Sequence, residues 1–343
     1  MIKSCPDPGN SMAATVFHFD LARSTKELHE GRSFAFSYDH LLANVVSFLA
    51  RRSIPKGGLA NGFAAVKVHF GEPGNFSFIA PHFIDPIVRA LMGLELAPFL
   101  TDTTVLYRSP RSNAVGHASV AAEHGFSPPC VRAPVIIADG LLGNDCVEVE
   151  IGQKWFDRVK IASAVAGAGS LVVVSHAKAH ALMGFSGAIK NLGMGCASKK
   201  GKQEQHAAPG RKGKSIRADD FPERVCEYAL GAVLGKMVIC VTFLINIVPY
   251  CDCNAHADLP IVPDIGILFS CDPVAIDQAA YDLVNRSRPI PGSVLARKPR
   301  RKDHFAALFP ETHPARQMKY GEKIGLGTTD YILSPIDGDF PTS

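Results

Sequence analysis

Residues 171–175 read LVVVS, an apolar run without the alternation of polar and apolar residues that a half-exposed strand shows. Residues 135–138, VIIA, have the same character. Strands of this kind are buried on both faces, which is typical of parallel sheets covered by helices on either side. These two runs therefore predict central strands of an α/β fold.

Segments with strand and helix patterns alternate outward from these runs. Further strands are predicted over residues 64–70, 98–101, 238–248 and 261–269. Helices are predicted over residues 38–52, 81–92, 113–124, 154–166, 222–234 and 272–285. Pro81 and Pro273 suit the first position of a helix, and Asp272 suits an N-cap. This order predicts an α/β fold with a largely parallel sheet and helices on both faces, in one main domain.

The main domain is expected to span residues 61–288. Residues 1–60 read as a weakly patterned N-terminal extension with one helix, and residues 289–343 as a basic, proline-rich C-terminal tail. Within the main domain, residues 175–220 form a segment rich in glycine, lysine and histidine.

The composition of the 343-residue chain is ordinary for a globular protein, with 47% hydrophobic and 20% charged residues. A net charge of +4 does not indicate a nucleic-acid-binding protein. The most apolar stretch, residues 237–249, is too short to span a bilayer, and residues 1–10 lack a secretory pattern. The nine cysteines are odd in number and scattered, so we expect reduced thiols. These features predict a cytoplasmic protein without a nucleic-acid or membrane partner.

Polar segments follow four of the predicted strands: HFGE (69–72), TDT (101–103), DG (139–140) and SH (175–176). Functional groups of open parallel sheets collect at the carboxyl ends of the strands. We therefore expect one cleft at that edge, formed by His69, Asp102, Asp139, His176 and Lys190.

The segment SHAKAH (175–180) places two histidines four residues apart. On a helical turn, His176 and His180 would share one face with the spacing of metal ligands. This predicts a site for a divalent metal of unknown identity, with His69 as a third ligand and His206 as a further partner. The alternative is that one histidine donates to a backbone carbonyl and the other is solvated.

A glycine-rich segment, residues 183–196, carries Lys190 and Asn191 on a short predicted helix. Glycine destabilises a helix by about 1 kcal/mol each, so backbone access or tight packing must compensate. One interpretation is a cradle of backbone N–H groups for an anion, with Lys190 as its charge. The other is close packing of a buried helix.

Other basic groups are candidates for binding an anionic substrate. Arg111 and His117 begin a predicted helix after a strand, and a surface ion pair is the alternative for them. The basic run 199–217, with Lys202 and His206 near its start, reads as a mobile loop or as a lid over an acidic ligand.

Cys251 and Cys253 form a C-x-C pair, and Cys271 is nearby in the sequence. These thiols are candidates for a metal or thiol site. The alternative is three buried, inert thiols.

These motifs resemble the domain-of-unknown-function 362 family. The matching stretches are VKVHFGEPGN (66–75), FLTDTTVLYRSPRSNAVGH (99–117), IIADGLLG (136–143), SHAKAHALMGFSGAIKNLGMGCASKKGKQEQH (175–206) and residues 251–284. The resemblance covers residues 64–285 and implies redox or metal chemistry without an assigned reaction.

Many members of that family carry a ferredoxin-like insert with iron–sulfur cysteines. Near the corresponding position, residues 214–226, this chain has only Cys226, and no C-x-x-C-x-x-C run occurs anywhere. We therefore do not expect a 4Fe–4S cluster. Alanines at 177 and 179 and Ser186 replace usual family residues but leave every ionisable group in place.

The combined prediction is an enzyme that acts on a carboxylate- or phosphate-bearing small molecule at a metal- or anion-dependent site. Asp102, Lys178 and Lys190 are the candidate acid–base or electrostatic groups. One alternative is an oxidoreductase that takes electrons from a separate ferredoxin. Another is a non-catalytic protein that handles metal or binds a ligand.

Overall fold

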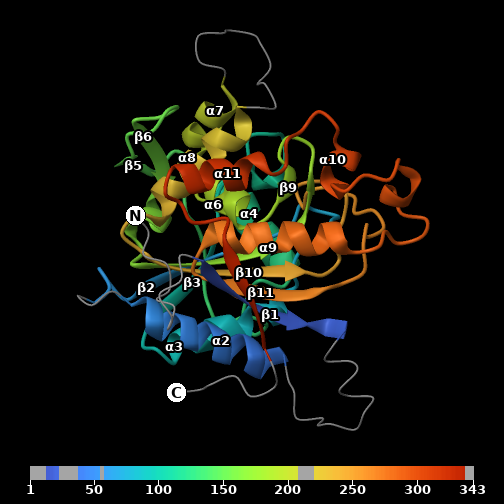
Figure 1. Cartoon of the computed structure of the whole chain (residues 1–343). Coiled ribbons are helices and arrows are strands. Elements are labelled where there is room, and N and C mark those ends of the chain that lie inside the picture. The colour runs from blue at the N-terminus through green and yellow to red at the C-terminus, as the bar shows by residue number, and fades with distance from the viewer. Residues whose placement is uncertain (1–12, 23–37, 55–57, 208–219, 337–343) are drawn as a thin grey trace.

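The computed structural model describes residues 13–22, 38–54, 58–207 and 220–336. Its centre is an eight-stranded sheet with the strand order β12-β1-β11-β10-β7-β2-β3-β4 (Figure 1). The strands are β1 (Ala14–Asp20), β2 (Phe63–Lys67), β3 (Ala97–Asp102), β4 (Val135–Ile137), β7 (Ser170–His176), β10 (Met237–Leu244), β11 (Gly266–Ser270) and β12 (Tyr331–Pro335). Only β11 runs against its two neighbours; every other pairing in this sheet is parallel.

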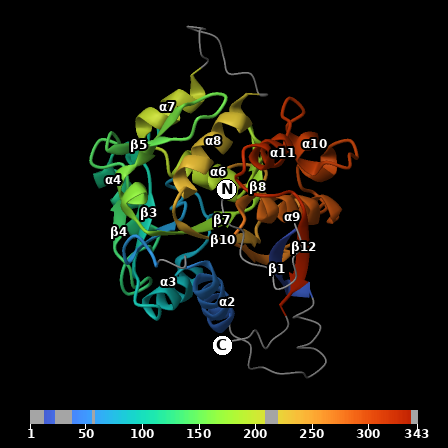
Figure 2. The ribbon, with the colours of Figure 1, turned by 60° about the vertical axis from the view of Figure 1, so that its left-hand side comes forward.

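Helices cover both faces of the sheet, as Figures 1 and 2 show. One face carries α2 (Tyr38–Ser53), α3 (Asp85–Met92) and α4 (Ala114–Glu123). The other carries α5 (Ser163–Gly167), α6 (Ala188–Gly195), α8 (Phe221–Val233), α9 (Pro273–Arg286), α10 (His304–Leu308) and α11 (Arg316–Lys323). The helix α7 (Lys199–His206) lies beside α8. The α/β fold, its largely parallel sheet and its single domain are confirmed.

The burial of the central strand β7 on both faces explains why its residues 171–174 are all apolar. Leu171 and Val173 pack into the core on one face of the sheet. Val172 and Val174 pack into the core on the other. Because side chains alternate along a strand, a strand covered on both faces needs an apolar residue at every position.

The predicted helix over residues 154–166 is wrong. Residues Arg158–Ala162 form β6, which pairs antiparallel with β5 (Cys146–Glu150), and only α5 follows as a short helix. Val159 and Ile161 are buried, whereas Arg158 is exposed. This alternation has the period of a strand and not that of a helix.

Both ends of the described chain add a strand to the main sheet. β1 comes from the predicted N-terminal extension and β12 from the predicted C-terminal tail, and the two pair in parallel. The strand character of β1 is locally weak because His18 interrupts its apolar residues. Its burial comes from β11 and β12, which are far away in the sequence.

The N-cap prediction at Asp272 is confirmed, because its side chain accepts hydrogen bonds from the N–H groups of Val274 and Ala275. No helix in the described ranges is long and apolar enough to cross a membrane.

Candidate functional site

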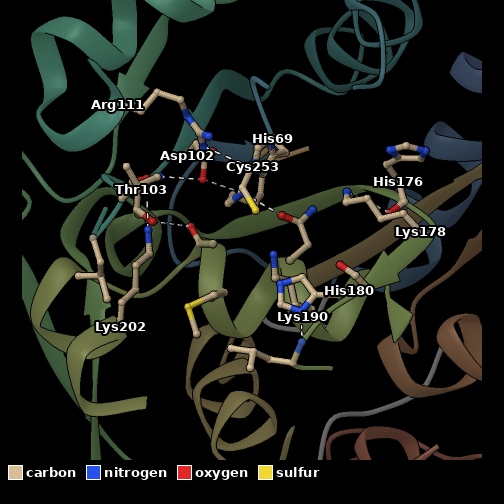
Figure 3. A pocket seen from close by; sticks show the side chains of 18 of the residues that line it. His69, Asp102, Thr103, Arg111, His176, Lys178, His180, Lys190, Lys202 and Cys253 are labelled. Carbon is tan, nitrogen blue, oxygen red and sulfur yellow. Dashed lines mark hydrogen bonds and ion pairs between the residues drawn. The ribbon is translucent and has the colours of Figure 1, made fainter. Parts of the chain in front are cut away.

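A cavity of about 260 Å³ opens at the carboxyl ends of β2, β3 and β7. Three neighbouring parallel strands end there in an ionisable residue, namely Lys67, Asp102 and His176. Eleven of the residues selected from the sequence line the cavity: His69, Asp102, Arg111, His176, Lys178, His180, Lys190, Asn191, Lys202, His206 and Cys253. Figure 3 shows Arg111, Asp102 and Lys202 toward one side and His176 and Lys178 toward the other.

The segment 176–180 is extended and not a helical turn. β7 ends at His176, and β8 (Lys178–His180) pairs antiparallel with β9 (Gly184–Ser186). Residues two apart on a strand point the same way. His176, Lys178 and His180 therefore all line the cavity, whereas the two alanines between them are buried in the core.

Asp102 is the centre of a closed network of charges on one side of the cavity. Its carboxylate lies 3.0 Å from Lys67 Nζ and 3.1 Å from a terminal nitrogen of Arg111. Burial alone would raise the pKa of Asp102, but Lys67, His117 and Arg111 outweigh it and hold the pKa well below its ordinary value. Asp102 is therefore permanently ionised and poorly suited to accept a proton.

Arg111 and His117 belong to this network and not to the protein surface. Arg111 Nη1 lies 3.0 Å from Glu72, and Arg111 Nε donates to His117 Nε2 at 3.1 Å. Burial lowers the pKa of His117 to about 3, so the ring is neutral and accepts this bond. His117 does not line the cavity; it fixes the orientation of the arginine that does.

A second network surrounds Asp252, a residue that sequence reasoning treated as a spacer between two cysteines. The fully buried carboxylate lies 2.5 Å from Lys178 Nζ and 3.0 Å from His176 Nδ1. Burial opposes ionisation, but the charges of Lys178 and His176 hold the pKa of Asp252 well below its ordinary value. The Asp252 carboxylate therefore balances the positive charge of Lys178 inside the protein.

The three histidines predicted to hold a metal make other contacts. His176 Nδ1 faces Asp252, and its Nε2 lies 3.1 and 3.0 Å from the carbonyl oxygens of Ile245 and Asn246. Both ring nitrogens of His176 therefore already face oxygen atoms of the protein. Among the described residues, no three His, Cys, Asp or Glu side chains are grouped closely enough to hold a metal ion. The metal role of His69, His176 and His180 stays a prediction.

The glycine-rich segment forms α6, whose first backbone N–H groups are already occupied. Ala188 N donates to one oxygen of Asp277 at 2.6 Å, and Ile189 N donates to the other at 2.9 Å. A Cβ on Gly193 would lie 2.1 Å from the Val225 carbonyl oxygen. These two N–H groups are therefore not available to an anion, and Gly193 serves close packing against α8.

Lys67 and Asn191 connect α6 to the sheet. Lys67 Nζ donates to Asn191 Oδ1 at 2.8 Å, and Asn191 Nδ2 donates to the Val174 carbonyl at 2.9 Å. A Cβ on Gly195 would lie 2.3 Å from Lys67 Cε. Lys67 was missed as a site residue, although a lysine inside the apolar run AAVKVHF is a signal that sequence reasoning could have used.

Two of the three predicted thiols lie beside α6. Lys190 Nζ lies 3.4 Å from Cys251 Sγ, and Cys253 lines the cavity. Cys271 is disulfide-bonded and packs in the core under α2, with its sulfur 3.0 Å from Ser53 Oγ. The antiparallel direction of β11 carries Cys271 to the edge opposite the carboxyl ends of the parallel strands. The three-thiol site and a fully reduced set of cysteines are therefore wrong.

The first part of the predicted basic loop is the helix α7, capped by Ser198, and residues 208–217 lie outside the described residues. Lys202 on α7 is buried and lines the cavity. Its Nζ donates to the carbonyls of Thr103 and Thr104 at 3.2 and 2.5 Å. Burial lowers the pKa of Lys202 to about 8.

Asp139 is close to this region but does not line the cavity. Its carboxylate accepts hydrogen bonds from the N–H and hydroxyl groups of Thr104, at 3.0 and 2.7 Å. The predicted convergence thus includes His69, Asp102, His176 and Lys190, whereas Asp139 supports the loop that positions Lys202.

Comparisons with known proteins give a family and several distant structural likenesses, of which two are described. The family described as "Domain of unknown function (DUF362)" matches residues 64–282. No curated protein matches the sequence.

A crystal structure of a protein from Thermotoga maritima has 11% identity and a TM-score of 0.43, covering 71% of this chain and 57% of that one. The lactate racemase apoprotein from Thermoanaerobacterium thermosaccharolyticum has 13% identity and a TM-score of 0.39, covering 70% and 53%. This chain thus spans little more than half the length of either structure, and neither likeness assigns it a reaction.

Proposed function

This chain belongs to the domain-of-unknown-function 362 family, and from that premise and the geometry of its cavity we propose an enzyme acting on a small carboxylate- or phosphate-bearing molecule. The anionic group of the substrate binds Lys202 at the end of the cavity formed by α6 and α7. Lys190 supplies a second positive charge on the same side.

The observation that carries the proposal is the environment of Lys202. Within the described parts of the chain, no carboxylate lies within ion-pair distance of its ammonium group, which contacts only the two threonine carbonyls. A lysine ammonium has three N–H donors, so one donor remains for a ligand. The carboxylates of Asp102 and Asp139 offset part of the cost of burying this charge without contacting it, and a bound anion would stabilise it further.

The remaining polar groups support an enzyme more than a simple binding protein. Burial, followed by the nearby charges of Arg111 for His69 and Lys190 for His180, lowers the pKa of both imidazoles. Neutral imidazoles at a cavity wall can accept a proton or donate one. Asp102 and Lys178, which the sequence suggested for acid–base work, act in this proposal through the electrostatic field of their ion pairs.

Calorimetric titration with inorganic phosphate and with acetate tests the binding step. Replacing Lys202→Met should weaken binding of the probe by about tenfold to a hundredfold, since a charged hydrogen bond is lost. Lys200→Met is the matched control, because Lys200 is an exposed lysine on the same helix. Equal binding by wild type and Lys202→Met would refute this assignment.

Turnover separates the enzyme from its alternatives. A panel of small carboxylates and phosphate monoesters should yield a product with the wild type and far less with Lys202→Met. Binding without product would favour the non-catalytic ligand-binding protein. Product formation that requires reduced ferredoxin would favour the oxidoreductase, an alternative that Cys253 at the cavity wall also supports.

A further inference from the structure

Cys251 and Cys253 lie on a tight turn that is anchored on several sides. Asn254 N donates to the Cys251 carbonyl at 2.9 Å, which closes the turn. Asp252, between the two cysteines, is held by Lys178 and His176, and its backbone carbonyl accepts from Glu72 N at 3.0 Å. The turn therefore keeps both thiols in a fixed relation to each other and to the cavity.

The two thiols differ in access and in electrostatic surroundings. Cys253 lines the cavity, whereas Cys251 is 4% exposed and contacts Lys190. A hydrogen bond from the Cys253 thiol lowers the pKa of Cys251 well below its ordinary value; burial opposes the shift, and Lys190, His180 and Lys178 favour it. The same shared proton raises the pKa of Cys253. The two thiols therefore share a proton, and the negative charge is favoured on Cys251.

We infer that Cys251 and Cys253 are a redox-active dithiol, which a low-molecular-weight disulfide entering the cavity oxidises to an intramolecular disulfide. A thiolate stabilised by a lysine and a second thiol two residues away are the two components that dithiol exchange requires. The dithiol needs no anion at Lys202, so its test is separate from that of the proposed function.

The exchange occurs in two steps. Cys253 passes its proton to Cys251, and the Cys253 thiolate attacks one sulfur of the small disulfide RSSR. A mixed disulfide forms at Cys253 and one RS⁻ leaves. Cys251 then loses its proton to the departing thiolate and attacks Cys253 Sγ, which releases the second RS⁻. Two electrons pass from the protein to RSSR, and the protein gains one disulfide bond.

Oxidised glutathione is the probe for this reaction in the full-length protein with Cys251 and Cys253 in the thiol form. After timed exposure, the free thiols are alkylated and the peptides are weighed by mass spectrometry. The peptide with Cys251 and Cys253 should lose two hydrogens and carry no glutathione. Cys130, an exposed cysteine, is the internal reference and should react about tenfold more slowly at neutral pH.

Two cysteine variants test the order of events. Cys251→Ser should trap glutathione on Cys253, since no second thiol can displace it. Cys253→Ser should react at least about tenfold more slowly than wild type, because Cys251 is buried. A wild-type peptide that keeps both thiols after Cys130 has reacted, or carries glutathione on each cysteine, would overturn the inference without any variant.

The pH profile tests the role of the charges around the pair. The charged groups are Lys190 from α6, Lys178 from β8 and Asp252 in the turn, and two further titratable groups, His180 from β8 and His69 after β2, also face the pair. The wild-type rate should reach its plateau at a lower pH than the rate at Cys130. Lys190→Met should move that plateau upward, whereas Lys200→Met should not. Identical profiles for wild type and Lys190→Met would remove the lysine from the proposal.

Discussion

Two groups of charged side chains line the same cavity and differ in whether an opposite charge contacts them. On the side of β2 and β3, the carboxylate of Asp102 is within 3.1 Å of both Lys67 and Arg111. Beside α6 and α7, Lys202 has no carboxylate partner among the described residues, and Lys190 contacts the sulfur of Cys251. The closed network holds the fold together around the cavity, and the open positive side is available to a ligand.

The largest expected effect comes from opening the closed network. Asp102→Asn leaves Lys67 and Arg111 buried with less negative charge, and breaking a buried ion pair destabilises by about 3–5 kcal/mol. Urea denaturation measures the change in the free energy of unfolding. Glu150→Gln, which breaks the exposed pair with Arg158, is the control and should change it by less than about 1 kcal/mol. Similar losses in both variants would contradict the contrast.

The contact between α6 and Lys67 gives the next largest effect. In Gly195→Ala the new Cβ would lie 2.3 Å from Lys67 Cε and 2.5 Å from Nζ, so the lysine must move away from Asp102. Overpacking of this kind costs about 1–3 kcal/mol. Gly167→Ala is the matched control, because its added Cβ meets no atom within 4 Å. If both variants unfold at the same urea concentration as wild type, the contact is not tight.

The open side should respond to pH. The pKa of Lys202 is lowered to about 8. Binding of an anion requires the ammonium form, so affinity is fully present below pH 8 and is lost as the pH rises above it. The loss should approach about tenfold per pH unit. Titration with sulfate, whose charge is constant across this range, measures the affinity at each pH. If the affinity does not change with pH and Lys202→Met binds sulfate as well as wild type, the open side does not bind anions through Lys202.

The smallest effect should be that of Lys202→Met on stability. The variant loses two hydrogen bonds to backbone carbonyls but also removes a buried charge without a carboxylate partner. We expect these contributions to offset each other to within about 1 kcal/mol in the free energy of unfolding. Lys67→Met is the comparison variant and should destabilise the protein more, since it removes an ion-pair partner of Asp102. Equal destabilisation by the two variants would mean that both lysines belong to the closed network.

The fold could be predicted where the required signal is local. The runs LVVV in β7 and MVICV in β10 are continuously apolar because both faces of these strands are covered. β1 was missed because its burial depends on strands from distant parts of the chain. The false helix over 154–166 arose because a short apolar stretch fits either period, and pairing with β5 decides between them.

The location of the site could be predicted from the sequence, but the ion pairs and hydrogen bonds within it could not. Ionisable residues after apolar strands pointed to the cavity, because the carboxyl ends of parallel strands meet at one edge. The ion pair between Lys178 and Asp252 joins positions 74 residues apart, and Asp277 caps α6 from 88 residues away. Neither pairing leaves a pattern in the neighbouring sequence, so the anchored turn and the occupied helix terminus became visible only in the structure.

The position of β1 between β11 and β12 sets an order for assembly on the ribosome. β1 is synthesised early, yet both strands that pair with it belong to the last part of the described chain. Until they emerge, its buried apolar residues Val16 and Phe19 have no sheet to join. The nascent chain must therefore carry an unpaired, partly apolar strand until β11 and β12 have been translated, a species that chaperones commonly shield.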